Sequence, residues 1–178
     1  MRRLLAGDRS GFSGRHFALA PGAGFEYEPL RPRIPLMLGT WKPRLAALAG
    51  RVADEVKIGG TANPEMVRLM RSWLGNDDVQ IVVGAVTVVD EDGDAARARA
   101  RDQVGMYLDV VGDLDPTVES PAPLDRFCIA GTPEEVAAHA RRLYDAGAGR
   151  VEFGTPQGLT TRRGVDLLCD RVLPLLRA

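Results

Sequence analysis

The chain has 178 residues, of which 45% are hydrophobic and 26% are charged, a composition typical of one globular domain. Its 23 Lys and Arg residues nearly balance 24 Asp and Glu residues, so the formal net charge of −1 gives no general attraction to nucleic acid or to anionic lipid. No apolar run approaches the roughly 20 residues that span a bilayer, and the amino terminus lacks the apolar core of a secretory signal. We therefore expect a cytoplasmic protein that binds neither nucleic acid nor membrane.

The cysteines and histidines give no sign of a disulfide or a metal site. Cys128 and Cys169 stand alone, without Cys-x-x-Cys spacing, and we expect two buried, reduced thiols. His16 and His139 have no second ligand at metal spacing, so we place both at the surface or its boundary. The expected metal content is none.

Strand and helix patterns alternate through most of the chain, which favours parallel strands joined by helical crossovers. Buried strands are predicted at 34–39, 55–59, 80–89 and 150–154, each followed by an amphipathic helix. The sequence Thr-Pro-Glu-Glu at 132–135 predicts a helix start, because it combines a capping threonine, a first-turn proline and a glutamate three residues after the threonine. The fold class is thus α/β, with four βα units in an open sheet and the helices outside it.

One helix and two irregular stretches complete this outline. The helix after the first strand is expected to bury Leu45, Leu48, Ala49 and Val52, which recur at helical spacing. The stretch 113–126 carries three prolines and predicts an irregular excursion, followed by a short extended segment at 127–130.

The first 31 residues differ from the rest because glycines and prolines interrupt short apolar groups. A hairpin is predicted between residues 12 and 19. We interpret 1–31 as a helix end and a hairpin insertion, and 32–178 as the part that holds the four βα units.

Glycines and hydroxyl side chains follow the first two predicted strands, at the edge where parallel sheets bind their ligands. Each group directly precedes a helix, whose first backbone N–H groups are unpaired and favour an anion. The pattern therefore predicts a phosphate-bearing ligand. The alternative is that the glycines only form tight turns and that Thr61 or Asn63 only caps a helix. The candidate ligand-binding residues are Gly39, Thr40, Trp41, Gly59, Gly60 and Thr61.

Two charged residues stand inside otherwise apolar strands. Alternation along each strand turns Lys57 and Glu152 toward the same inner face, where strands on either side of a common neighbour can share a layer. The two charges could pair there, or one or both could reach solvent at a strand end.

Two long stretches resemble a known family. IPLMLGTWKPRLAALAGRVADEVKIGGTANPEM and AGTPEEVAAHARRLYDAGAGRVEFGTPQG are similar to the carboxyl-terminal portion of luciferase-like oxidoreductases. Within that superfamily, VKIGGTANPEM and VEFGTPQG most resemble methylenetetrahydromethanopterin reductases, which use a deazaflavin coenzyme. The resemblance covers the chain from about Arg31 to its end.

The resemblance implies strands five to eight of a luciferase-like (β/α)₈ TIM barrel, with the coenzyme's phosphate tail near the loops after strands five and six. It implies 8-hydroxy-5-deazaflavin (coenzyme F-420) as cofactor, with FMN as the alternative. In such enzymes the coenzyme carries the hydride chemistry, and the sequence offers no catalytic triad, so the catalytic residues stay unassigned.

Because a full barrel takes at least roughly 200 residues, we expect this chain to lack the first four strands. A half barrel leaves apolar surface open, so we expect self-association or a partner that supplies the missing half. The leading function is a fragment of a deazaflavin-dependent oxidoreductase acting on a small organic substrate. The alternatives are an FMN-dependent luciferase-like monooxygenase and a non-catalytic half-barrel remnant or assembly module.

Overall fold

The computed structural model describes residues 2–28, 30–31, 33–119 and 121–177. The chain divides into two units, Met1–Leu36 and Met37–Ala178. Sequence interpretation places the division between residues 31 and 32, and Pro32 itself lies outside the described residues.

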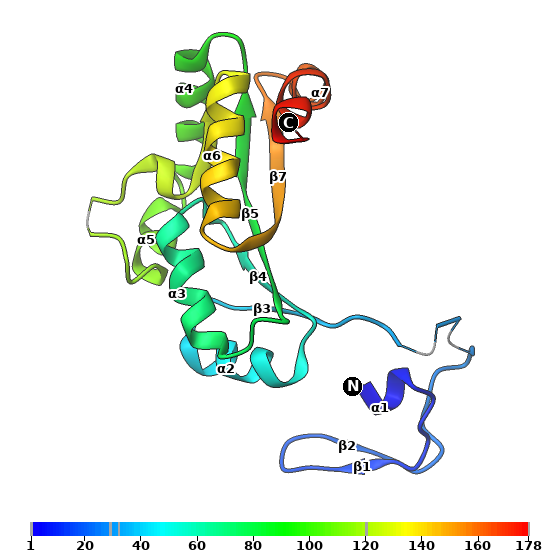
Figure 1. The fold of residues 1–178 in the computed structure, drawn as a ribbon. Coiled ribbons are helices and arrows are strands. Elements are labelled where there is room, and N and C mark those ends of the chain that lie inside the picture. Colours follow the sequence, from blue (N-terminus) through cyan, green and yellow to red (C-terminus); the bar gives the residue numbers. More distant parts are fainter. Residues whose placement is uncertain (1, 29, 32, 120, 178) are drawn as a thin grey trace. The chain divides into compact units, whose positions relative to one another are not determined.

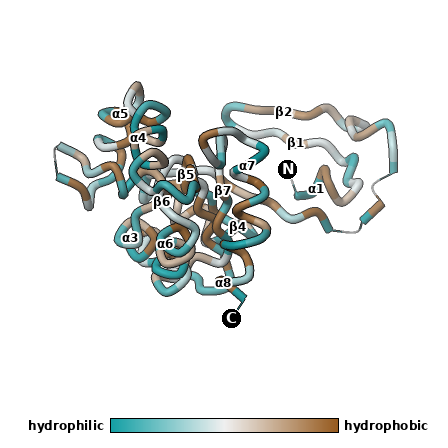
Figure 2. The backbone as a smooth tube through the Cα atoms, turned by 90° about the horizontal axis from the view of Figure 1, so that it is seen from above, coloured by the Kyte–Doolittle hydropathy of each residue, from teal (hydrophilic) through white to brown (hydrophobic). Residues whose placement is uncertain are grey.

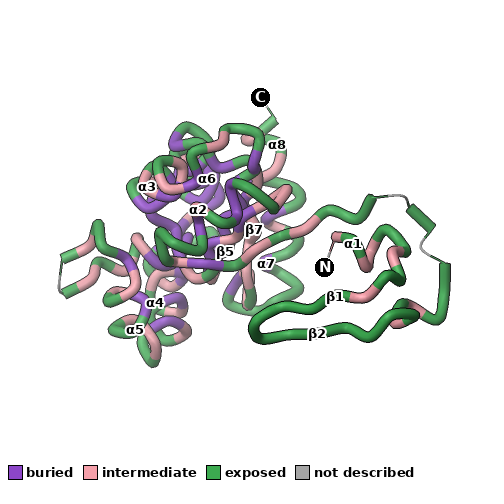
Figure 3. Tube along the Cα trace, turned by 90° about the horizontal axis from the view of Figure 1, so that it is seen from below, coloured by how far each residue is buried: buried purple, intermediate pink, exposed green. Residues whose placement is uncertain are grey.

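The first unit is small and mostly exposed, as the green tube of Figure 3 shows. Its elements are α1 (Arg2–Leu5), β1 (Phe12–Ser13) and β2 (Ala18–Leu19). The two strands form an antiparallel hairpin, and the Gly14 N–H donates to the Phe17 carbonyl at 2.9 Å across the turn. The Arg3 guanidinium pairs with the Asp8 carboxylate at 2.6 Å and so ties α1 to the turn that precedes the hairpin.

The second unit is built on a five-stranded sheet in which every recorded pairing is parallel (Figure 1). All four predicted strands are present, together with a fifth at the segment expected to be extended. The first is shorter than predicted, because its pairing begins only where Met37 lies opposite Glu55 and because Pro35 has no N–H to donate. The strands are β3 (Met37–Gly39), β4 (Glu55–Gly59), β5 (Gln80–Val89), β6 (Cys128–Gly131) and β7 (Ala148–Gly158).

The long strand β5 is the centre of the sheet and is apolar over most of its length (Figure 2). One of its edges pairs with β4 over residues 80–84 and with β6 over residues 86–89. Its other edge pairs with β7 from Ile81 to Val89. This arrangement differs from a simple sequential order, because β6 extends the edge of β4 and does not separate β5 from β7.

Helices connect these strands and cover the sheet. The helices are α2 (Pro43–Val52), α3 (Pro64–Leu74), α4 (Gly93–Val104), α5 (Leu108–Leu114), the 3₁₀ turn η1 (Leu124–Arg126), α6 (Pro133–Asp145), α7 (Thr161–Leu167), the π-helical turn η2 (Leu168–Val172) and α8 (Leu173–Arg177). The predicted capping box at the start of α6 is confirmed: Thr132 accepts from the Glu135 N–H, and the Glu135 carboxylate accepts from the Thr132 N–H at 2.8 Å. None of the described helices has the length and apolar character needed to cross a bilayer.

Two hydrophobic clusters lie on opposite faces of β5. The larger one packs α2, α3, α6 and the carboxyl-terminal helices against side chains that include Ile81 and Val83. The smaller one packs α4 against Val88 and Cys128, whose side chains point to the other face by alternation. The prediction that all helices lie outside, on one face, is therefore wrong for α4, which covers the inner face at the carboxyl end of β5.

Three further predictions from the sequence are wrong in detail. Helix α2 buries Ala49 as predicted, together with Ala46 and Gly50, whereas Leu45, Leu48 and Val52 are each about 40% exposed. Small residues face the core because α2 packs closely on α3: a Cβ at Gly50 would lie 2.0 Å from the Leu74 carbonyl oxygen. Cys169 is exposed, and only Cys128 is buried, with its thiol pKa raised to about 12 by that burial. His139 is buried and not at the surface.

Candidate functional site

The two glycine-containing loops predicted to bind a ligand lie side by side at the carboxyl ends of β3 and β4. The Thr40 N–H donates to the Lys57 carbonyl at 3.0 Å, which continues the pairing of the two strands. The indole Nε1–H of Trp41 then donates to the Gly59 carbonyl at 3.0 Å. This hydrogen bond joins the two loops, so the residues after the first two strands form one rim.

The glycines of this rim face open space. A Cβ built on Gly39 or on Gly59 would meet no heavy atom within 4 Å, and both residues are exposed. Gly60 has a φ of +81°, a conformation that glycine adopts without strain. The backbone at these three positions can therefore be approached closely by a ligand.

The hydroxyls of the two rim threonines are engaged in hydrogen bonds within the fold, as the alternative of a purely structural Thr61 predicts. The Thr40 hydroxyl accepts from the Lys42 N–H at 3.0 Å in a tight turn. The Thr61 hydroxyl accepts from the Asn63 N–H at 3.1 Å and donates to the Arg126 carbonyl at 3.3 Å. The Gly60 N–H is also engaged, with the Gly84 carbonyl at 2.6 Å. A ligand at this rim can therefore approach the chain most closely at Gly39 and Gly59.

Four charged side chains form a connected array on the inner face of the sheet, on β4 and β7. Lys57 and Glu152 form a hydrogen-bonded ion pair, which confirms that the two charges found in apolar strands meet. The Arg150 guanidinium makes two hydrogen bonds to the Glu55 carboxylate, at 2.9 and 3.0 Å, and a third to Glu152 at 3.3 Å. The hydrogen bond from Lys57 lowers the pKa of Glu152, despite the opposing effect of burial. The array contains two positive and two negative charges and is balanced.

Other elements hold the loop between β4 and α3 in place. Asn63 caps α3 by accepting from the Glu65 N–H at 3.0 Å. Ring nitrogen Nε2 of His139 on α6 donates to the Ala62 carbonyl at 2.7 Å. Burial lowers the pKa of His139, so the ring is held in its neutral form. The shape of this loop therefore depends on α6 as well as on the strands.

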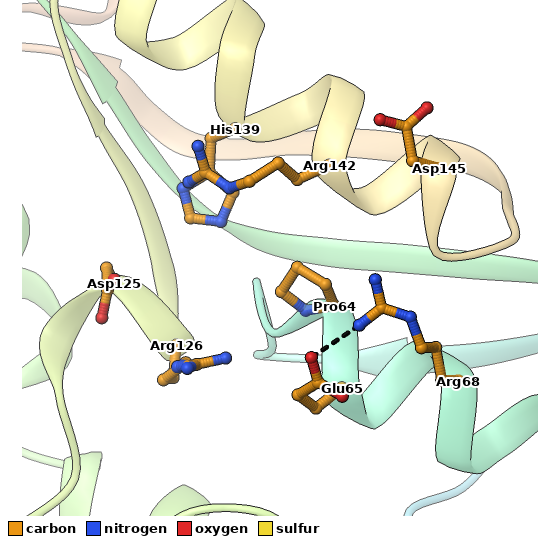
Figure 4. Close-up of a pocket in the computed structure, with 8 residues that line it drawn as sticks. All are labelled: Pro64, Glu65, Arg68, Asp125, Arg126, His139, Arg142 and Asp145. Atoms are coloured by element: carbon orange, nitrogen blue, oxygen red, sulfur yellow. Dashed lines mark hydrogen bonds and ion pairs between the residues drawn. The ribbon is translucent and has the colours of Figure 1, made fainter.

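A separate cavity of about 390 Å³ opens between the start of α3, η1 and α6 (Figure 4). In Figure 4 the Arg142 side chain extends along α6 toward His139, and across the cavity Glu65 at the start of α3 is paired with Arg68. Three arginines and three carboxylates line this cavity, so it carries no net charge that would select an ion. It differs in place and in character from the rim of glycines.

The described residues contain no group of three or more His, Cys, Asp and Glu side chains that could hold a metal ion. The Cys128 thiol is buried against α4, and its pKa is raised by that burial.

Comparison with known proteins identifies relatives for the whole chain. The sequence profile of the luciferase-like monooxygenase family matches residues 1–150. The 5,10-methylenetetrahydromethanopterin reductases of Methanolobus tindarius and Archaeoglobus fulgidus are 23% and 24% identical, over 95% and 99% of this chain. The chain spans 60% and 64% of the lengths of these two relatives.

Solved structures share the fold. The coenzyme F-420-dependent tetrahydromethanopterin reductase of Methanopyrus kandleri has a TM-score of 0.76 at 19% identity, with 97% of this chain and 59% of that chain covered. A coenzyme F-420-dependent secondary alcohol dehydrogenase, in complex with an F-420–acetone adduct, has a TM-score of 0.75 at 20% identity, with 99% and 58% covered. The sequence resemblance is confirmed, and the chain belongs to the luciferase-like monooxygenase family.

Proposed function

We propose that this chain supplies the coenzyme-tail-binding part of a luciferase-like oxidoreductase. The enzyme would transfer hydride between 8-hydroxy-5-deazaflavin (coenzyme F-420) and a small organic substrate. Relatives whose names specify coenzyme F-420 or a tetrahydromethanopterin reductase support the coenzyme class. The chain spans about 60% of the length of those relatives, and we propose that its rim works together with the remaining βα units of a complete barrel.

The observation that carries this proposal is the open, joined pair of glycine loops at the rim. The Trp41–Gly59 hydrogen bond holds the loops together, and no atom lies within 4 Å of a Cβ at Gly39 or Gly59. A phosphate needs close approach to the backbone, and the open positions of Gly39 and Gly59 allow it. Lys57, two residues before Gly59, is the nearest cation along β4, and it is paired with Glu152. The residues present fit a phosphate-bearing coenzyme.

In this assignment each rim residue has a physical role. Gly39, Gly59 and Gly60 let the tail approach the backbone, and the half-buried Trp41 provides an apolar wall while its N–H holds the neighbouring loop. Thr40 and Thr61 fix the loop shape through the hydrogen bonds described above and need not touch the ligand. The coenzyme, when bound, supplies the hydride chemistry, and this chain orients it and excludes water.

An FMN-dependent monooxygenase is the second candidate within the fold, which the monooxygenase RslO1 from Streptomyces bottropensis shares with a TM-score of 0.72 at 23% identity. Both candidates place a phosphate at the same rim, and they differ in the ring that the coenzyme carries. A non-catalytic half barrel is the candidate of another class, and it predicts no coenzyme binding.

The test is a fluorescence titration of the purified chain with coenzyme F-420, with its phosphate-free deazariboflavin form, and with FMN. We expect F-420 to bind at least tenfold more tightly than the phosphate-free form. Gly59→Asp should abolish that preference by placing a carboxylate in the open space, whereas the matched control Gly59→Ala should keep most of it. Equal binding of F-420 and the phosphate-free form, or no effect of Gly59→Asp, would contradict the assignment.

A further inference from the structure

The residue Asn63 connects the rim loop to a segment more than 50 positions away in the sequence. We propose that Asn63 is a positioning residue for the segment between α4 and β6, residues 105–119 and 121–127, which we call the excursion. In this proposal Asn63 fixes the excursion as a wall of the rim site, and this wall determines which coenzyme tails fit. The inference rests on the proposed function, because it concerns the same rim.

The side chain of Asn63 is fully buried and uses both ends of its amide. Its Oδ1 accepts from the Glu65 N–H at 3.0 Å and from the Arg126 guanidinium at 2.7 Å. Its Nδ2 donates to the Asp115 carboxylate and to the Thr117 hydroxyl, both at 2.8 Å. A helix cap needs only the first of these contacts, so the other three serve to hold the excursion.

The partner Asp115 is only 2% exposed, and its two oxygens are both engaged. Oδ2 accepts from Asn63, and Oδ1 accepts from the N–H and the hydroxyl of Thr117 at 2.9 and 2.7 Å. A buried carboxylate left without such donors would destabilise the fold strongly. The Asn63–Asp115 contact is therefore the fixed point at which the excursion meets the rim loop.

Two contacts bring the excursion to the rim itself. The Arg126 carbonyl at the end of η1 accepts from the Ala62 N–H at 2.8 Å and from the Thr61 hydroxyl at 3.3 Å. On α5, Val111 Cγ1 lies 3.6 Å from the position of a Cβ on Gly60. Val111 thus bounds the space beside one of the rim glycines, and the position of α5 decides how much room a tail has there.

Exchanging the amide of Asn63 with the carboxylate of Asp115 tests the proposal, because the double variant should restore what the single variant loses. Asn63→Asp puts two carboxylates in contact and should free the excursion, whereas Asn63→Asp combined with Asp115→Asn restores one amide and one carboxylate. We expect the single variant to lose at least tenfold of its affinity for coenzyme F-420, with no comparable loss for the phosphate-free form. The double variant should recover most of the loss. Unchanged F-420 binding in a folded Asn63→Asp variant would overturn the inference.

A second readout does not depend on the coenzyme. Limited trypsin digestion after Arg126 should be faster in Asn63→Asp than in the wild type, and slow again in the double variant. If the wild-type chain binds neither ligand, the proposed function fails, and digestion alone then decides whether Asn63 holds the excursion. Equal digestion rates in all three proteins would overturn that part.

Val111→Trp provides a variant that leaves the Asn63 network intact. The larger ring narrows the space beside Gly60 and should weaken F-420 binding, while the phosphate-free form binds as before and Arg126 stays protected from trypsin. Full F-420 affinity in Val111→Trp would show that α5 does not bound the tail.

Discussion

Lys57 on β4 and Glu152 on β7 form an ion pair that passes over Gly84 of the intervening strand β5. The two strands are second neighbours, roughly 10 Å apart at ordinary strand spacing. Gly84 leaves room for the pair: a Cβ there would lie 3.2 Å from Lys57 Cε, tighter than an ordinary contact, and 3.5 Å from the Glu152 carboxylate. The ion pair thus connects β4 and β7 across β5 on the inner face of the sheet.

Removing the charge of Glu152 should have a small, pH-dependent effect on stability. Both side chains are more than a third exposed, so we expect Glu152→Gln to lower the free energy of unfolding by about 0.5–1 kcal/mol at pH 7. Lys57 lowers the pKa of Glu152 in the fold, so this contribution is present above the unfolded pKa of about 4.3 and is lost as the pH falls through the folded pKa. Urea unfolding of both proteins at pH 7 and pH 3 measures it. A difference that grows toward low pH would contradict the assignment.

Gly50→Ala should destabilise the protein although alanine is the better helix former. In an exposed helix this change would gain roughly 1 kcal/mol. Here the new Cβ would lie 2.0 Å from the Leu74 carbonyl oxygen, and Gly50 also accepts a hydrogen bond from Asn76 at 2.8 Å. The helices must move apart, at a cost of about 1–3 kcal/mol. Thermal unfolding should show this loss, whereas the control Gly39→Ala, in open space, should unfold like the wild type.

His139 should make stability fall on mild acidification. Burial lowers its pKa in the fold, so the stability it contributes is full above the unfolded pKa of about 6.5 and declines as the pH falls below that value. His139→Gln keeps a donor for the Ala62 carbonyl but cannot be protonated. The wild type should therefore lose more stability than His139→Gln between pH 7.5 and pH 5.5. Parallel losses in urea unfolding at the two pH values would show that the histidine does not titrate with unfolding.

Short-range sequence patterns predicted the main strands of the sheet and the position of the rim loops. Short apolar runs located all four main strands, and the Thr132 capping box located α6, because each is encoded within a few neighbouring residues. Alternation also placed Lys57 and Glu152 on one face. It does not encode which edge of β5 a short segment joins, so the pairing of β6 beside β4 could not be predicted.

The roles of the rim side chains depend on distant partners. The sequence left Thr61 either as a ligand candidate or as a cap, and it could not indicate that the Thr61 hydroxyl donates to the Arg126 carbonyl, 65 positions away. Asn63 was considered only as a cap, since nothing near it in sequence signals Asp115. A glycine loop after a strand can be recognised from neighbouring residues alone. The hydrogen-bond partners of a buried hydroxyl or amide depend on the folded chain, because they can lie far away in sequence.

The exposed apolar face of α2 gives a prediction about assembly. Leu45, Leu48 and Val52 lie one turn apart along α2, and each is about 40% exposed, whereas such side chains are usually covered by a neighbouring element. Strand β3 next to this helix pairs on one edge only, with β4, among the recorded pairings.

We expect the purified chain to self-associate in size-exclusion chromatography. Leu45→Glu with Leu48→Glu should shift it toward the monomer without lowering its unfolding temperature, because neither side chain belongs to the buried core. The matched control Arg44→Glu changes charge on the same helix without removing apolar surface and should leave the elution unchanged. A wild-type chain that elutes as a monodisperse monomer at all concentrations would show that it needs neither a second copy nor a partner to cover this surface.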